Sequence, residues 1–298
     1  MSHKKQKSRG CLLKMIVLLS VLLILLLVLC YREASRNIGQ SMETSPTTQR
    51  PEGIPQETDV MDAVATEPVK TEPMQTQPEE SQLPPGPGPL VVIDSGHQAK
   101  GNREQEPIGP GAAQMKAKVT SGTHGVITGL QEYELNLLVA EKLKTTLENR
   151  GYRVEMIRNE HDVDISNAER AVMANELKAD VFIRIHANGA ADPGAHGIMT
   201  LCQTPENPYN GQLYSLSRKL SQLILDETAA ATGGKKQYVW ETDTMTGINW
   251  CQVPVTIVEM GYMSNPKEDQ LMATEDYQQK LAEGIANGVD RYFNTGTQ

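Results

Sequence analysis

Short apolar runs alternate with amphipathic segments over the last two thirds of the chain. Runs of four to six residues at 90–94, 152–157, 180–185 and 255–258 have the character of strands buried in a parallel sheet. The spacing of apolar residues between and after them predicts helices over the following segments: 133–150, 166–178, 212–230 and 274–293. Strands that alternate with helices predict an α/β fold with a single, mostly parallel, twisted sheet flanked by helices.

The start of the chain has a different pattern. Residues 15–31 are apolar except for Ser20, and as a helix they would rise about 26 Å, nearly the ~30 Å hydrocarbon core of a membrane. A cleavable signal peptide is the alternative, but no small-x-small cleavage site follows. We therefore expect a transmembrane signal anchor at 15–31, with the basic residues 1–14 in the cytoplasm. This predicts a single-pass protein of the cell membrane whose remaining chain lies on the extracytoplasmic side.

Between the anchor and the first strand lies a segment of low complexity. Residues 32–89 hold ten of the seventeen prolines, no aromatic residue, and many Glu, Thr and Gln. Such a composition cannot repay the entropy of folding. We therefore expect 32–89 to be a disordered linker and 90–298 to be one globular catalytic domain.

Composition narrows the class of protein. The formal net charge is −9 and the sequence pI is about 5.3, whereas a nucleic-acid binder needs a basic face. Nucleic acid is therefore excluded as a partner. The domain contains only Cys202 and Cys251, which could form one disulfide or remain as two buried thiols.

Polar residues follow three of the predicted strands. His97 comes shortly after the first strand, His186 directly after the strand at 180–185, and Glu259 directly after the strand at 255–258. Ligands of open α/β sheets gather beyond the carboxyl ends of the strands, so these side chains are expected at one rim. Glu132 and Glu134 open a helix that begins at the same rim.

Two imidazoles and one carboxylate are the ligands of hydrolytic zinc sites, in which the metal lowers the pKa of a water to about 7. An additional acid that is not a ligand would serve as general base. A single histidine after a strand is more often structural, whereas two at matching strand ends favour a metal. Three further histidines lie in loop-like, solvated segments: His124, His161 and His196. The residues alone thus predict a metallohydrolase with either Glu132 or Glu134 at the site.

Five motifs extend this reading over residues 90–293. They are VVIDSGH at 91–97, Glu132 with Asn136 and Leu137, Ser166 to Arg170 with Asn175, IHAN at 185–188, and VEMGYMSN at 258–265. In this order they resemble the motifs of the zinc-dependent N-acetylmuramoyl-L-alanine amidases of bacterial cell walls, of the amidase-3 type.

The resemblance implies a role for each candidate. His97, Glu132 and His186 would bind one Zn²⁺ per domain, Glu259 would be the catalytic acid-base, and Glu134 would be an ordinary residue of the first helical turn. The substrate would be peptidoglycan, cut at the amide bond between N-acetylmuramic acid and L-alanine. The membrane helix and linker would hold the enzyme within reach of the wall, and no protein regulator can be named.

This chain departs from the family pattern at several places. Arg184 stands where the family often has Ser and Gln98 where it often has Gly, so we expect a different rim of the pocket. Residues 100–131 predict a long glycine-rich loop that would be a lid, a substrate-binding wall or a solvated insertion. Trp240 and Trp250 could stack on sugar rings or pack in the core. Arg170 and Asn175 are expected to have structural roles.

Two other functions fit the same residues. A zinc peptidase could cut within the stem peptide of peptidoglycan, and a catalytically silent protein could only bind the cell wall. Intact residues at all four key positions argue against the silent protein.

Overall fold

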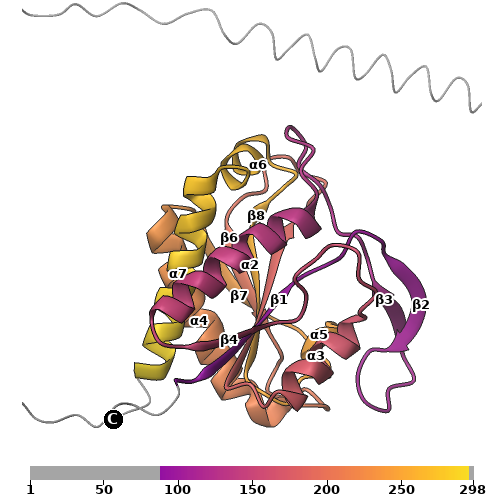
Figure 1. Cartoon of the computed structure of the whole chain (residues 1–298). Helices are drawn as coiled ribbons and strands as arrows, with labels where there is room; N and C mark the ends of the chain where they lie inside the picture. Colours follow the sequence, from indigo (N-terminus) through magenta and orange to yellow (C-terminus); the bar gives the residue numbers. More distant parts are fainter. Residues whose placement is uncertain (1–87, 295–298) are drawn as a thin grey trace, which may run out of the picture. The chain divides into compact units, whose positions relative to one another are not determined.

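The structure, a computed structural model, describes residues 88–294 of the chain (Figure 1). The predicted basic start, the membrane anchor and nearly all of the linker lie outside the described residues, as do residues 295–298. Among residues 88–294, no helix combines the length and apolar character needed to cross a membrane.

Six strands form the main sheet, in the order β4-β1-β5-β8-β6-β7. Only β6 and β8 pair antiparallel, and all other neighbours are parallel. The predicted mostly parallel sheet is therefore confirmed, with one antiparallel pair. The strand bounds are β1 Leu90–Ser95, β4 Arg153–Met156, β5 Val181–Asn188, β6 Ile198–Cys202, β7 Lys236–Glu241 and β8 Val255–Tyr262.

Helices cover both faces of this sheet (Figure 1). One face carries α2 Glu132–Asn149, α4 Tyr214–Thr232 and α7 Glu275–Asn294, and the other carries α3 Asn167–Glu176 and the single-turn α5 Thr246–Asn249. The short helix α6 Pro266–Met272 follows β8, and the 3₁₀ turn Gly211–Leu213 precedes α4.

The apolar run of β1 is continuous because both of its faces are covered. Val91 and Ile93 pack into the core under α2, α4 and α7, whereas Leu90 and Val92 pack into the core under α3 and α5. This alternation is the two-residue period of a strand. It fixes which way the chain leaves β1, and therefore where His97 is placed.

The last helix, α7, packs against α2 and α4. A Cβ atom added at Gly284 or Gly288 would lie 2.5 Å from the Cα of Thr228 or Ile224 on α4, so these glycines allow the two helices to approach closely. Near the C-terminal end of α7, Asp290 Oδ2 accepts a hydrogen bond from Arg150 Nη1 at 2.6 Å. Helix α7 thus closes the larger of the two cores.

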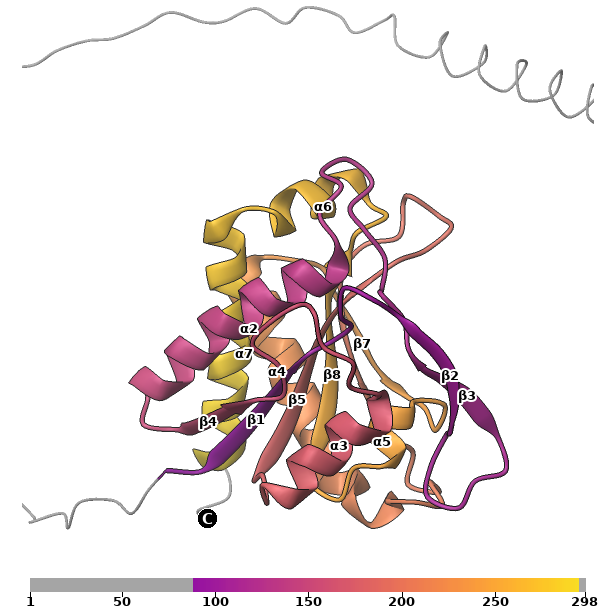
Figure 2. The same cartoon turned by 45° about the vertical axis from the view of Figure 1, so that its right-hand side comes forward.

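The segment predicted as a glycine-rich loop is largely a β-hairpin, so that prediction was wrong. Strands β2 Asn102–Pro107 and β3 Met115–Val119 pair antiparallel beside α3 and α5 (Figure 2). The hairpin is held at both ends: Trp250 Nε1 donates to the Pro107 carbonyl at 2.9 Å, and Asn167 Nδ2 to the Lys118 carbonyl at 2.7 Å. It is therefore a fixed wall on this side of the sheet.

Candidate metal centre

Three predicted ligands meet at the carboxyl ends of the central strands. His97 follows β1, Glu132 is the first residue of α2, and His186 lies on β5. Glu132 Oε1 is 3.1 Å from His97 Nε2 and 3.2 Å from His186 Nδ1. One ligand atom from each residue lies within 4.8 Å of the other two, so the three could hold one metal ion.

The backbone and one hydrogen bond orient His97. Its φ of 63° lies in the left-handed region that non-glycine residues seldom adopt, and such outliers cluster at functional sites. Its Nδ1–H donates to the Thr120 carbonyl at 2.9 Å. Because that bond fixes the proton on Nδ1, Nε2 is left as the lone-pair donor facing Glu132.

Backbone amides hold the Glu132 carboxylate. Thr123 N–H donates to Oε2 at 2.9 Å and Ala187 N–H to Oε1 at 3.1 Å. Burial alone would raise the pKa of Glu132, but the contacts with His186 and His97 outweigh it and hold the pKa well below its usual range. Glu132 is therefore ionised at neutral pH, as a metal ligand must be.

His186 is packed tightly against the end of β1. A Cβ atom added at Gly96 would lie 2.2 Å from the imidazole, so only glycine leaves room for the ring. Burial is the main cause that lowers the pKa of His186 to about 4. The imidazole is therefore neutral at neutral pH, which is the form that binds metals.

The alternative acid, Glu134, does not join this group. Its Oε2 accepts a hydrogen bond from Gln131 N–H at 3.1 Å, which closes the capping box of α2. The histidines predicted to be solvated are all exposed: His124, His161 and His196. The spatial arrangement thus brings together Glu132 and the two histidines of the IHAN and SGH motifs.

Glu259 lies beside His186 on the neighbouring strand, with the two residues in register. Its Oε2 is buried and has no hydrogen-bond partner among residues 88–294. Burial of the carboxyl group, followed by the negative charge of Glu132, raises the pKa of Glu259 to about 8. Without a metal this carboxyl group is therefore mostly protonated at neutral pH, and a cation held by the three neighbouring ligands would favour the ionised form, which accepts a proton.

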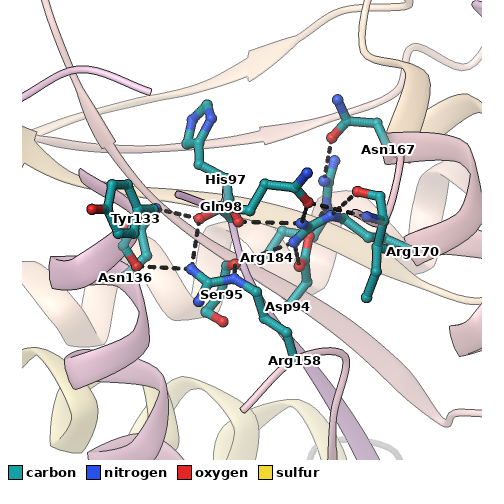
Figure 3. Close-up of polar contacts among 12 residues, drawn as sticks. Asp94, Ser95, His97, Gln98, Tyr133, Asn136, Arg158, Asn167, Arg170 and Arg184 are labelled. Carbon is teal, nitrogen blue, oxygen red and sulfur yellow. Dashed lines mark hydrogen bonds and ion pairs between the residues drawn. The ribbon is translucent and has the colours of Figure 1, made fainter. Parts of the chain in front are cut away.

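Beneath His97, buried arginines gather around one carboxylate (Figure 3). Asp94 Oδ1 accepts from Arg170 Nη1 at 2.6 Å, and Asp94 Oδ2 accepts from Arg184 Nε at 2.8 Å. Burial would raise the pKa of Asp94, but Arg170 and Arg184 outweigh it and hold the pKa well below its usual range. Arg170 also donates to the His97 carbonyl at 3.2 Å, so it supports the left-handed turn.

Two departures from the family pattern have different outcomes. Gln98 does not shape the rim as expected, because it is fully buried and its Oε1 accepts from Arg170 Nη2 at 2.8 Å. Arg184 does line the cavity at the site. Asn175 bridges α3 to the segment after α5, accepting from Gln252 N–H and donating to the Trp250 carbonyl, as expected of a structural residue.

Two cavities share the side chains of the site. His97, His186 and Glu259 line both a cavity of about 270 Å³ towards the hairpin and α5 and a wider one of about 670 Å³ towards residues 122–124 and 188–191. Lys116 and Ala117 of β3 line the smaller cavity, so the hairpin has the place of the expected substrate-binding wall. No sequence signal had marked Lys116.

The structure also decides between the alternatives left open for the two cysteines and the two tryptophans. Cys202 and Cys251 are both buried and free, so the disulfide alternative was wrong. Trp250 packs against the core under α3 and α5, and Trp240 lies on the edge strand β7 with 43% of its surface exposed. Neither tryptophan lines the two cavities at the site.

The described domain is similar to known enzymes in sequence. The family model described as N-acetylmuramoyl-L-alanine amidase matches residues 91–291. The N-acetylmuramoyl-L-alanine amidase AmiC of Neisseria meningitidis is 30% identical over 246 residues, which cover 70% of this chain and 54% of AmiC. An N-acetylmuramoyl-L-alanine amidase of Mycobacterium tuberculosis is 28% identical over 220 residues, covering 71% of this chain and 89% of that protein.

A solved structure of an amidase is also similar to this domain. The crystal structure of the N-acetylmuramyl-L-alanine amidase Ami1 of Mycobacterium smegmatis superposes with a TM-score of 0.64 at 28% identity, over 70% of this chain and 98% of that one. This chain thus spans nearly the whole of the mycobacterial enzyme but about half of the meningococcal one.

Proposed function

Because the chain belongs to the N-acetylmuramoyl-L-alanine amidase family, we propose that it hydrolyses the amide bond between N-acetylmuramic acid and L-alanine in peptidoglycan. The observation that carries the proposal is one cavity lined by two histidines of the ligand cluster and by Glu259, whose buried Oε2 has no hydrogen-bond partner in the part of the chain that the structure describes. The matched span includes all four residues.

The donor set fits a zinc ion. His97, Glu132 and His186 would hold it, since they present an imidazole with a free Nε2, an ionised carboxylate and a neutral imidazole from three fixed backbone positions. Zinc supplies Lewis-acid chemistry: it polarises a carbonyl group and acidifies a water.

The chain's own residues supply the proton transfers. Glu259 lies beside His186, and no residue of the described domain hydrogen-bonds its Oε2, so in the ionised form this oxygen could accept a proton from the attacking water. The same group then returns the proton to the departing amine of L-alanine. Thr123, Ala187 and Thr120 keep the ligand side chains in place during the reaction.

Digestion of purified peptidoglycan tests this function. Mass spectrometry should find intact stem peptides with a new free amino group on L-alanine and glycan strands with a free lactyl carboxyl group. A new amino group inside the stem peptide would instead establish the peptidase alternative. Zinc binding without any cleavage would establish a wall-binding protein.

The membrane location belongs to the same proposal. Residues 15–31 are apolar and follow a basic segment, which supports an anchor that holds the domain outside the membrane. The intact chain should therefore fractionate with cell membranes and resist extraction by high salt. A mature protein that begins after Tyr31 and is found free of membranes would contradict the anchor.

A further inference from the structure

Besides the residues of the site, the smaller cavity is lined by two basic residues and several polar ones. Its lining includes Lys116 on β3, Asn167 at the start of α3, Arg184 on β5, and Thr246 and Gly247 on α5. None of these has a part in the proton transfers or metal binding described above. They are contributed by four elements that are far apart in the sequence, so the fold brings them together at this cavity.

The charge of Arg184 is only partly balanced. Arg184 is 2% exposed, and its guanidinium group donates to Asp94 Oδ2 at 2.8 Å and to Asn167 Oδ1 at 2.7 Å (Figure 3). Asp94 has a single negative charge and pairs with Arg170 as well. The two arginines and one aspartate therefore sum to one net positive charge, and Lys116 adds a second to the lining of this cavity, where Glu259 is the one carboxyl group among the described lining residues.

The lining of the same cavity also contains a buried hydroxyl group. Thr246 is 3% exposed, and its Oγ1 has no hydrogen-bond partner among the described residues. Next to it, Gly247 packs directly on Arg184, since an added Cβ atom would lie 1.9 Å from Nη1. A buried hydroxyl without a partner costs free energy, which a bound ligand would recover.

The position of Arg184 on β5 sets its distance from the metal-ligand candidate His186. Arg184 and His186 are two residues apart on β5, so both side chains point to the same face and their Cα atoms are about 7 Å apart. About two residues of extended peptide span this distance. A group held by Arg184 would therefore lie about two residues from the bond that is cut.

The wider cavity has the opposite character. Among its lining residues in the described chain there is neither lysine nor arginine. The muramoyl side of the scissile bond is an uncharged sugar, because its lactyl carboxyl is in the amide, whereas the stem peptide has free carboxylates. Charge complementarity thus directs the peptide into the smaller cavity and the glycan into the wider one.

We propose that Lys116, Arg184 and Thr246 form a subsite that binds a free carboxylate of the stem peptide, on the residue that follows L-alanine. The proposal rests on the amidase function for the identity of this ligand. Arg184 and Lys116 supply the positive charge, and the Thr246 hydroxyl donates a hydrogen bond. The side chain of residue two continues the peptide, so its α-carboxylate is free unless it is amidated.

Binding measurements on matched peptides test the subsite. The full-length protein with Glu259→Gln would be titrated with an N-acetylmuramoyl tripeptide whose second residue has either a free α-carboxylate or a carboxamide. The free carboxylate should bind about 10- to 100-fold more tightly, the range expected for charge-assisted hydrogen bonds. Lys116→Gln and Thr246→Val should each reduce this preference by about 3- to 10-fold.

Lys118→Gln is the matched control, because the substitution removes the same charge from the same strand. The Lys118 side chain pairs with Glu104 and does not line the cavity. It should leave the preference unchanged. Equal binding of the two peptides, or an equal loss with Lys118→Gln, would overturn the subsite. The binding measurement does not depend on hydrolysis. If the wild-type chain cleaves nothing but the Lys116-dependent preference for the free carboxylate is found, the subsite is upheld and the amidase function is refuted. Cleavage without any preference would do the reverse.

Discussion

Glu259→Gln should lower the rate of peptidoglycan hydrolysis about 10²- to 10⁴-fold, the usual contribution of a positioned acid-base group. Glutamine keeps the size of the side chain but cannot accept a proton. Since no described residue hydrogen-bonds Oε2, the exchange breaks no hydrogen bond of this oxygen and the fold should persist. The rate of release of stem peptides from purified peptidoglycan measures the effect.

Zinc content separates the possible roles of Glu259. If the group only transfers protons, the variant should keep one zinc per chain by atomic emission or absorption. Loss of zinc in Glu259→Gln would make this residue a ligand. A normal rate with zinc present would remove it from the mechanism.

Replacing His97, Glu132 or His186 by alanine should abolish both zinc binding and hydrolysis. Each substitution removes one of three donors that converge on a single point. Loss of Glu132 also leaves the amides of Thr123 and Ala187 without their acceptor. Zinc analysis of the purified variants, together with the digestion assay, gives both readouts, and circular dichroism verifies the fold.

Glu134→Ala is the control for this series. Glu134 stands two residues from Glu132 on the same helix but turns back to cap it. The variant should keep full zinc content and activity and lose only the stability of a helix cap, about 1 kcal/mol. Full zinc in Glu132→Ala together with loss of zinc in Glu134→Ala would reverse the ligand assignment.

The site could be found in the sequence because its polar residues interrupt buried strands. Apolar runs predicted β1, β5 and β8, and the residues after them, His97, His186 and Glu259, do meet at one rim. Two of these residues in fact lie inside longer strands, because β5 and β8 continue to Asn188 and Tyr262 beyond the apolar runs. Spacing alone could not choose between Glu132 and Glu134. The choice depends on a capping box formed by Gln131.

Elements held by distant contacts escaped prediction. The β2 sequence NREQEP has no apolar run, and the hairpin is held by α5, about 140 residues later, where Asn249 donates to the Ile108 carbonyl. The edge strand β7 alternates half-buried with exposed positions and so shows a weak pattern. β6 is wholly buried, and its run IMTLC after Gly197 was a signal that could have been used.

The position of α7 has a consequence for biosynthesis. This helix comprises the final described residues of the chain, yet it covers the apolar faces of α2 and α4, and its own Leu281, Ile285 and Val289 are fully buried against them. While a ribosome is still making the polypeptide, these faces have nothing to pack against. The larger core therefore cannot be completed until residues 275–294 have left the ribosome, and a messenger truncated before codon 275 would yield a chain for proteolysis rather than a partly active enzyme.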